Sequence, residues 1–233
     1  MTGAMEKARR ASAPFDLLVF DWDGTLMDSI ATIVDCTIDA LSRLDGVVPP
    51  PRARVREAIG MGLRESIDLY YPGHTETFFA ELLEVYRDLW IGTYRDRSTL
   101  LPGARETIEA LVEAGYRLGV ATAKSRRGLE RELEATGLGP AFVATRTVDE
   151  APPKPHPGMI LGLCEELGVE PGRALMIGDT TFDLDMARAA GAPALGVLTG
   201  SHDHERLSSS GPLAVLASVA QVPAWLDGRS LAV

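Results

Sequence analysis

The sequence predicts an α/β protein with a doubly wound parallel sheet and an inserted all-helical segment. Short, continuously apolar runs recur along the chain, and each is followed by a polar or glycine-containing turn. Stretches with helical periodicity separate these runs, and strands that alternate with helices are typical of a parallel sheet covered on both faces. The alternation stops between Ser29 and about Thr99, where the pattern is helical throughout.

The first strand is expected at Leu17-Leu18-Val19-Phe20, an apolar run that ends in a cluster of Asp, Gly and Thr. Its lack of polar positions indicates a strand buried on both faces. Further strands are expected at 117–122, 174–177 and 194–197, with a weaker candidate at 142–144. Helices are expected at 104–114, 125–136, 158–167 and 183–190.

The helical insertion is expected to begin at Ser29, which suits a helix N-cap. Apolar residues then recur at helical spacing, and a second long stripe runs over 75–94, with shorter helices at 52–59 and 63–70. The insertion leaves and re-enters the chain near the carboxyl end of the first strand, so it should cover the crevice where such sheets bind ligands. We therefore predict a core domain at 14–28 and 100–233, a helical cap domain at 29–99, and an unstructured lead-in over residues 1 to about 13.

Composition narrows the possible partners. The 233 residues are 45% hydrophobic, enough for one sizeable core, and carry a net charge of -10. This acidity argues against nucleic acid or an anionic membrane as the main partner, but a small anionic substrate remains compatible with it.

The two cysteines, Cys36 and Cys164, lie in apolar helical patterns and are expected to be reduced and buried. No apolar run reaches the roughly 20 residues of a membrane span, so a cytoplasmic protein is expected, either monomeric or homodimeric.

Two groups of carboxylates follow predicted strands. Asp21 and Asp23, in Asp21-Trp22-Asp23-Gly24-Thr25, come directly after the first strand, and residues two apart in an extended chain point to the same side. Gly24 permits a close approach of the backbone to a ligand. Asp179 and Asp183 follow the strand at 174–177 and are expected one helical turn apart. Four carboxylates at one edge require a cation, and a carboxylate-rich site with room for phosphate suits Mg²⁺.

Two further residues follow the intervening strands. Thr122 ends the strand at 117–122 and begins the loop Ala123-Lys124-Ser125, where a hydroxyl and backbone N–H groups near a helix start can bind phosphate oxygens. Lys154 lies in the stiff segment Pro152-Pro153-Lys154-Pro155, which holds its ammonium in place. Each feature alone has an ordinary explanation as a turn, a strand end or a solvated charge. Their shared position after successive strands favours one site.

This set of residues resembles the four motifs of the haloacid dehalogenase superfamily, whose core is Rossmann-like. The resemblance rests on Asp21 to Leu26, Thr122, Lys154-Pro155 and Gly178 to Asp183, and it covers the chain from Phe15 onward. The helical insertion after Asp28-Ser29 is similar to that of the phosphoglycolate-phosphatase-like branch, in which Pro102-Gly103 also matches an element at the exit of the cap. The resemblance implies a Mg²⁺-dependent phosphatase that acts on a small phosphorylated metabolite, such as phosphoglycolate or a sugar phosphate.

The resemblance also implies a role for each matched residue. Asp21 would be the nucleophile and a metal ligand, and Asp23 the general acid and base, with its backbone carbonyl on the metal. Asp179 would be a direct metal ligand, and Asp183 a ligand or its support. Thr122 and Lys154 would bind the phosphoryl group that is transferred. Such roles suit phosphoryl transfer, which needs an in-line nucleophile and charge stabilisation.

The substrate is less well specified. Many relatives have Asn after the threonine of the second motif, whereas this chain has Ala123, whose backbone N–H can still bind phosphate. The predicted inter-helix loop from Gly60 to Arg64 is the best candidate for substrate selection, with Arg56 and Arg64 as possible substrate-binding residues or ordinary helix surface.

Four other functions share parts of the pattern. A dehalogenase is disfavoured because the dehalogenases of the superfamily lack the second carboxylate of the first motif, which this chain has as Asp23. A phosphomutase resembling β-phosphoglucomutase would share every residue named above, and only a test for phosphate retained on a sugar product separates it from a phosphatase. Non-enzymatic alternatives are a phospho-accepting receiver domain, which has no large helical insertion, and a catalytically silent regulator that binds sugar phosphates.

Overall fold

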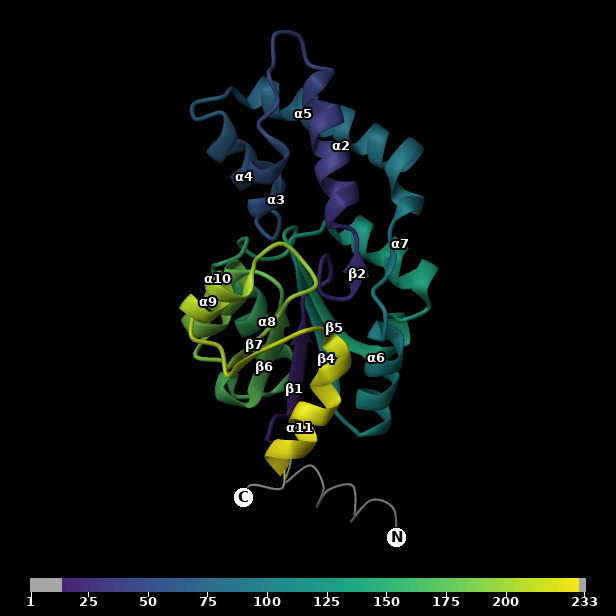
Figure 1. The fold of residues 1–233 in the computed structure, drawn as a ribbon, viewed down its shortest axis with the longest axis vertical. Helices are drawn as coiled ribbons and strands as arrows, with labels where there is room; N and C mark the ends of the chain where they lie inside the picture. The colour runs from purple at the N-terminus through teal and green to yellow at the C-terminus, as the bar shows by residue number, and fades with distance from the viewer. Residues whose placement is uncertain (1–13, 231–233) are drawn as a thin grey trace.

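The computed structural model describes residues 14–230 and has a six-stranded sheet at its centre. The strand order is β5-β4-β1-β6-β7-β8, and each neighbouring pair is parallel. The predicted α/β class with a doubly wound parallel sheet is confirmed (Figure 1). The strands are β1 (Leu17–Phe20), β4 (Arg117–Thr122), β5 (Phe142–Thr147), β6 (Ala174–Gly178), β7 (Ala194–Val197) and β8 (Ala214–Leu216).

Helices cover both faces of this sheet because its strands are apolar on both sides. In β1, Leu18 and Phe20 pack into one hydrophobic cluster with Ile108, whereas Leu17 and Val19 pack into a second cluster on the opposite face. This is the alternation expected of a strand buried between two helical layers. The helices of this part are α6 (Ala104–Glu113), α7 (Arg126–Thr136), α8 (Gly158–Leu167), α9 (Thr181–Ala190), α10 (His204–Ser209) and α11 (Val222–Ser230), with 3₁₀ turns η3 (Gly139–Ala141), η4 (Pro171–Arg173) and η5 (Val219–Gln221).

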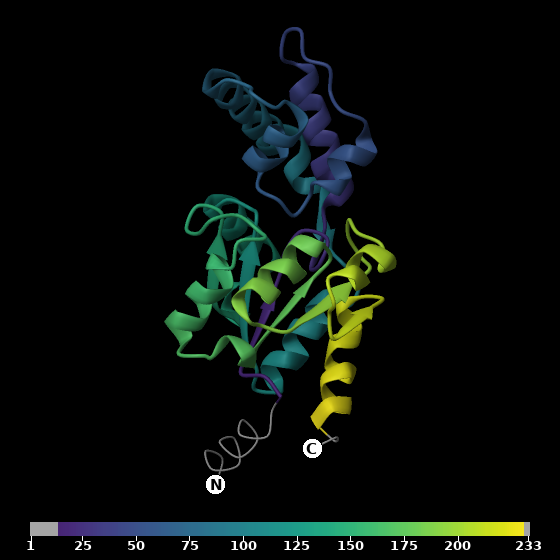
Figure 2. The same cartoon turned by 90° about the vertical axis from the view of Figure 1, so that its left-hand side faces the viewer.

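A second, wholly helical part stands above the carboxyl ends of the strands (Figures 1 and 2). It has its own hydrophobic cluster, which includes Leu41, Ile67 and Leu82. The chain enters it through β2 (Met27–Asp28) and leaves through β3 (Thr99–Leu100), which pair as a short antiparallel ribbon. The division of the chain into a core domain at 14–28 and 100–233 and a cap domain at 29–99 stays a prediction. The helices are α2 (Ile30–Ser42), α3 (Arg52–Glu57), α4 (Leu63–Tyr70), α5 (Glu76–Leu89), the π-helix η1 (Trp90–Tyr94) and the 3₁₀ turn η2 (Arg95–Arg97).

Several local predictions differ from the structure. Ser29 occupies the N-cap position of α2, as predicted, but its hydroxyl makes no capping bond and instead donates to Asp23. The helix expected over 183–190 begins at Thr181 because Thr180 caps it. The weak strand at 142–144 extends to Thr147. The ribbon β2–β3, strand β8 and helices α10 and α11 were not predicted, since most of these elements are short and carry no clear hydrophobic period.

The remaining sequence-based expectations concern cysteines, membrane segments and the amino-terminal lead-in. Cys36 and Cys164 are free and buried, as expected, and burial raises the pKa of the Cys36 thiol to about 12. Across residues 14–230, no helix is long and apolar enough to cross a membrane. The predicted lead-in lies outside the described residues.

Candidate active site

The candidate site lies where the carboxyl ends of three adjacent strands meet. Strand β1 pairs with β4 on one side and with β6 on the other. The loops that follow these strands begin at Asp21, at Thr122 and at Asp179, respectively, so the parallel arrangement brings them to one edge of the sheet. All three side chains are buried.

Lys154 joins this edge from the loop before α8. Its Nζ lies 2.7 Å from Asp21 Oδ1 and 2.6 Å from Asp183 Oδ1, and its side chain is fully buried. Burial alone would lower the pKa of Lys154, but Asp183 and Asp21 raise it above its ordinary value, so the ammonium is charged. One buried positive charge is therefore shared between two carboxylates.

Asp179 is held by groups from two other loops. Its Oδ1 accepts a hydrogen bond from the Thr25 hydroxyl at 2.9 Å, and its Oδ2 accepts one from the Ser201 backbone N–H at 2.8 Å. The backbone of Gly24 also lies against this carboxylate: a Cβ added there would be 2.6 Å from Asp179 Oδ2, and the φ of Gly24 is +83°. Both the contact and the left-handed conformation require glycine.

Asp183 has two structural connections. As the third residue of α9 it completes a capping box with Thr180, whose hydroxyl donates to Asp183 Oδ2 at 2.7 Å. Its other oxygen, Oδ1, faces Lys154. Asp179 precedes the helix, so the two carboxylates do not share a helical face as predicted, although the turn still brings them together.

The site carries an excess of negative charge that suits a divalent cation. Asp21, Asp179 and Asp183 each place a carboxylate oxygen within 4.8 Å of the other two. When all three carboxylates are ionised, the single ammonium of Lys154 leaves two negative charges without a counter-charge. Burial and then the charge of Asp183 raise the pKa of Asp21 well above its ordinary value and that of Asp179 to about 7. A buried, all-oxygen cluster with this charge fits Mg²⁺.

Asp23 lies outside this cluster. Its Oδ1 accepts a hydrogen bond from the Ser29 hydroxyl at 2.7 Å, and its Oδ2 lies 3.2 Å from Lys124 Nζ. Asp21 and Asp23 both line the same cavity, as expected of carboxylates that face one site, but their immediate neighbours differ. The chain turns after β1, which gives Asp23 a separate set of neighbours on the cavity side.

A buried network that the sequence did not reveal supports Asp23. Lys124 Nζ bridges Asp23 to Glu132 Oε1 at 3.0 Å, and the indole N–H of Trp22 donates to Glu132. The ammonium also lies 5.1 Å from the ring centroid of Trp90, in the helical part. Burial alone would lower the pKa of Lys124, but Asp23 and Glu132 raise it, so the ammonium is charged next to Asp23.

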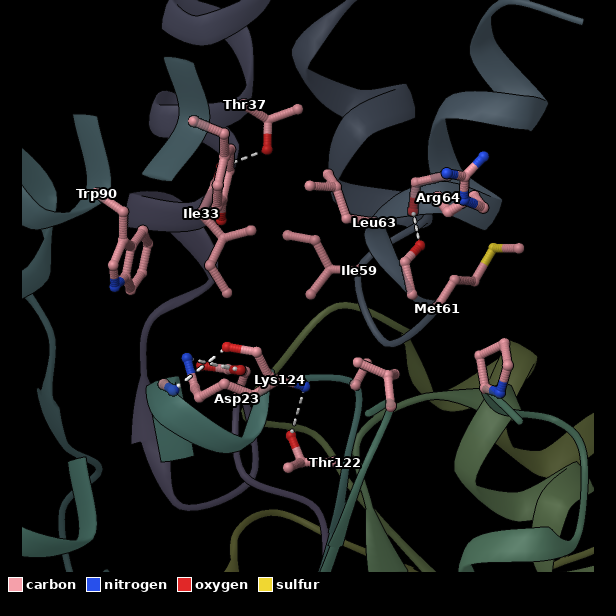
Figure 3. Close-up of a pocket in the computed structure, with 18 of the residues that line it drawn as sticks. Asp23, Ile33, Thr37, Ile59, Met61, Leu63, Arg64, Trp90, Thr122 and Lys124 are labelled. Atoms are coloured by element: carbon pink, nitrogen blue, oxygen red, sulfur yellow. Dashed lines mark hydrogen bonds and ion pairs between the residues drawn. The ribbon is translucent and has the colours of Figure 1, made fainter. Parts of the chain in front are cut away.

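A cavity of about 710 Å³ separates this edge of the sheet from the helical part. Asp21, Asp23, Thr122 and Ala123 line its floor, and Figure 3 shows Asp23, Lys124 and Thr122 below side chains that descend from the helices. The Thr122 hydroxyl accepts a hydrogen bond from the Lys124 backbone N–H at 3.2 Å. The cavity is large enough for an organic phosphate.

The two arginines predicted to bind substrate have different positions. Arg64 lines the cavity, but its guanidinium forms two hydrogen bonds with Glu76, at 2.8 and 2.9 Å, and lies over the Phe79 ring. Arg56 is outside the cavity lining and donates to the carbonyl of Gly200, in the loop next to Asp179. A role for either residue in substrate binding stays a prediction.

Among the residues of the site that were not predicted, Glu132 could have been recognised from the sequence. Glu132 follows Leu129 by three residues in α7, so it lies on the buried face of that helix, where a charged side chain needs a partner. Ser201 and Trp90 gave no such signal, because their contacts join segments far apart in the chain.

Comparison with known proteins assigns the family. Residues 18–197 match the family model described as haloacid dehalogenase-like hydrolase. The chain belongs to this family. The "Probable phosphatase IndB" of Dickeya dadantii is 34% identical over 212 residues, which cover 88% of this chain and 91% of that protein. A phosphoglycolate phosphatase of Vibrio vulnificus is 30% identical over 215 residues, covering 88% and 93% of the two chains.

A solved structure supports the same conclusion. A protein described as a predicted phosphoglycolate phosphatase from Haemophilus somnus superimposes with a TM-score of 0.79 at 26% identity, over 91% of this chain and 98% of the other. The expected membership of the haloacid dehalogenase family and the expected enzyme class, a phosphatase, are thereby confirmed.

Proposed function

We propose that this haloacid dehalogenase-like phosphatase hydrolyses a small phosphorylated metabolite with Mg²⁺ as cofactor and with a phospho-aspartate on Asp21 as the intermediate. The observation that carries the proposal is the buried cluster at the floor of the cavity, in which Lys154 pairs with Asp21 and Asp183 and the three carboxylates, once ionised, have two negative charges more than this ammonium neutralises. The relatives named as phosphatases support the same reaction.

In this proposal, Mg²⁺ is held by Asp21, Asp179 and Asp183, with the Asp23 backbone carbonyl as a further ligand. When bound, the ion neutralises the excess charge of the carboxylates and the charge of the phosphate oxygens. Asp21 Oδ attacks the phosphorus, and the P–O bond to the alcohol breaks. Lys154, Thr122 and the backbone N–H of Ala123 bind the phosphoryl oxygens.

Asp23 moves the protons. It donates one to the leaving alkoxide and, as a carboxylate, then takes one from the water that hydrolyses the phospho-aspartate. Lys124 and Ser29 fix the position of its carboxylate on the cavity side. This requirement for a second carboxylate next to the nucleophile distinguishes the proposed reaction from attack on carbon.

The test is release of inorganic phosphate from phosphoglycolate, sugar phosphates and p-nitrophenyl phosphate, with Mg²⁺ and with excess chelator. We expect activity that requires Mg²⁺ and that Asp21→Asn abolishes, because an amide is a poor nucleophile. Asp45→Asn, which changes an exposed aspartate of the helical part, is the control. Full activity in chelator contradicts the role of the metal, and a phosphate retained on a sugar product indicates a phosphomutase.

A further inference from the structure

Large apolar side chains form much of the cavity wall that faces the candidate nucleophile. Ile33 of α2, Ile59 and Leu63 project from the helical part toward the space above Asp23 and Thr122 (Figure 3). Trp90 borders the same space from the side. These side chains come from separate helices and loops, so the apolar wall belongs to the cavity as a whole and not to a single helix face.

Three polar side chains on this wall are already bonded within the helical part. The Thr37 hydroxyl donates to the Ile33 carbonyl at 2.8 Å, and the Ser66 hydroxyl donates to the Gly62 carbonyl at 3.0 Å. The Tyr70 hydroxyl donates to the carbonyl of Val55. These three hydroxyls can still accept a hydrogen bond from a bound sugar, but none can donate one without breaking its present bond, so the wall offers few donors to a polar substrate.

Two of the basic side chains near the wall are already paired with carboxylates of this chain. Arg64 is paired with Glu76, and Lys124 is paired with Asp23 and Glu132. Glu65 lines the cavity, and its charge disfavours a substrate that carries a carboxylate close to the phosphate. Four more arginines line the cavity. Arg87, Arg95 and Arg127 are exposed, so they stand where the cavity meets solvent, whereas Arg131 is half-buried in α7, outside the helical part that carries the apolar side chains named above.

The volume of the cavity also favours a substrate with an apolar substituent. A cavity of about 710 Å³ lies within the range of pockets that enclose drug-sized ligands, whereas phosphoglycolate has only two carbons. A short substrate would leave the apolar side chains of Ile59 and Leu63 facing water. An apolar substituent of four or more carbons would displace that water and would gain the corresponding transfer free energy.

We propose that the substrate is a phosphomonoester whose alcohol carries an uncharged, apolar chain or ring next to the phosphate, held against Ile33, Ile59, Leu63 and Trp90. This inference rests on the proposed phosphatase function and names its substrate class. The phosphate occupies the floor at Asp21, Thr122 and Lys154, and the hydrocarbon fills the space beneath the helical part. The reaction is the same hydrolysis, with the P–O bond broken, the alcohol protonated and inorganic phosphate released.

A series of primary alkyl phosphates isolates this preference. Ethyl, butyl and hexyl phosphate have similar leaving groups, so differences in kcat/KM report binding of the chain. Complete burial of one methylene corresponds to roughly three- to fourfold. The four additional methylenes of hexyl phosphate need be only partly buried to give a large effect. We expect its kcat/KM to be at least tenfold higher than the value for ethyl phosphate and also at least tenfold higher than the value for phosphoglycolate. Equal values for ethyl and hexyl phosphate would overturn the proposal.

Binding measurements keep this test independent of turnover. Ethylphosphonate and hexylphosphonate cannot be hydrolysed, and calorimetry with Mg²⁺ present should give a Kd at least tenfold lower for hexylphosphonate. If no ester is hydrolysed but hexylphosphonate binds more tightly, the proposed function fails and the apolar site stands. If esters are hydrolysed without any dependence on chain length, the proposed function stands and the apolar site is wrong.

Two substitutions in α4 provide a matched pair. Leu63 lines the cavity, whereas Leu69 is 48% exposed and outside its lining. We expect Leu63→Asn to lower the ratio of hexyl to ethyl phosphate kcat/KM at least fivefold, and Leu69→Asn to leave this ratio unchanged. Equal ratios in the two variants, with both folded by circular dichroism, would contradict the assignment of the wall.

Discussion

Asp21 and Asp23 are chemically identical side chains two residues apart, and the fold gives them different neighbours. Both line the cavity floor, but Asp21 lies with Asp179, Asp183 and Lys154, whereas Asp23 is bonded to Ser29 and Lys124. An in-line nucleophile and a proton donor must approach the phosphoryl group from different directions. Their separation in the structure therefore agrees with the two roles that we propose.

Substitution of Asp23 should separate the two steps of the reaction. In Asp23→Asn, p-nitrophenolate leaves without needing a proton, so phosphorylation of Asp21 proceeds. Hydrolysis of the phospho-aspartate lacks its general base and should slow by roughly 10² to 10⁴-fold. Stopped-flow measurements should show a burst of p-nitrophenolate near one per site, and acid-quenched protein should carry an acyl phosphate. A variant without burst and trapped phosphate, or one with the parent rate, would assign Asp23 another role.

Lys124 should affect the rate of phosphate release by holding the Asp23 carboxylate in place. Without its ammonium, the carboxylate keeps only the hydrogen bond from Ser29, and a displacement of about 1 Å can cost roughly 100-fold in rate. We expect Lys124→Met to lower kcat by roughly 10- to 100-fold and to change KM much less. Glu132→Gln, which leaves the pair of Lys124 and Asp23 intact, should lower kcat less. If both variants lower kcat equally, Lys124 has no specific effect on Asp23.

At the scale of elements, helix α3 reaches the loop that holds Asp179. Arg56 donates to the Gly200 carbonyl, and His202 Nε2 lies 3.3 Å from the Glu57 carbonyl. The same loop gives its Ser201 N–H to Asp179, and a Cβ on Gly200 would overlap the Asp179 carboxylate. The position of the helical part is thus linked to the position of a proposed metal ligand.

Two arginines of α3 test this link. Arg56 contacts the loop, whereas Arg54 donates to the Leu69 carbonyl within the helical part. We expect Arg56→Ala to raise the Mg²⁺ concentration for half-maximal activity several-fold, because second-sphere contacts tune metal affinity. Arg54→Ala should leave this concentration unchanged. An equal shift in both variants would indicate a general effect on the helical part.

Sequence periodicity was sufficient for the elements with long, regular patterns. Strand β1 lies where it was predicted because its apolar run is uninterrupted, and helix α4 because its apolar residues recur at helical spacing. The short ribbon β2–β3 has two residues per strand, too few for a period. The neighbours of Asp23 could not be predicted either, since the contact from Lys124 depends on how the chain turns after β1 and on helix α7.

At the scale of the whole molecule, much of the site can be inferred from strand order. Parallel strands bring their carboxyl ends to one edge, so residues that follow successive strands meet whatever their separation in sequence. This reasoning placed Asp21, Thr122 and Asp179 at one edge, where the structure has them. It gives no information about the cavity wall, whose Ile33, Leu63 and Trp90 come together only through packing in the helical part.

Stability of the whole protein should depend on pH when no metal is bound. Burial and Asp183 raise the pKa of Asp179 to about 7 and also raise that of Asp21, whereas an unfolded aspartate titrates near 3.9. The folded state therefore holds protons that the unfolded state has lost. This contribution is fully present below about pH 4, decreases as pH rises, and is lost above about pH 7.

Melting curves in chelator should therefore show a falling Tm between pH 5 and pH 7.5, and a change of 1 kcal/mol corresponds to about 2–4 °C for a chain of this size. Mg²⁺ binds the deprotonated carboxylates, so its stabilisation should be larger at pH 7.5 than at pH 5. Asp179→Asn removes one of the groups and should flatten both trends, while Asp45→Asn, at an exposed position, should change neither. A Tm in chelator that rises over this interval, with no greater effect of Mg²⁺ at the higher pH, would mean that the buried carboxylates do not form the metal site.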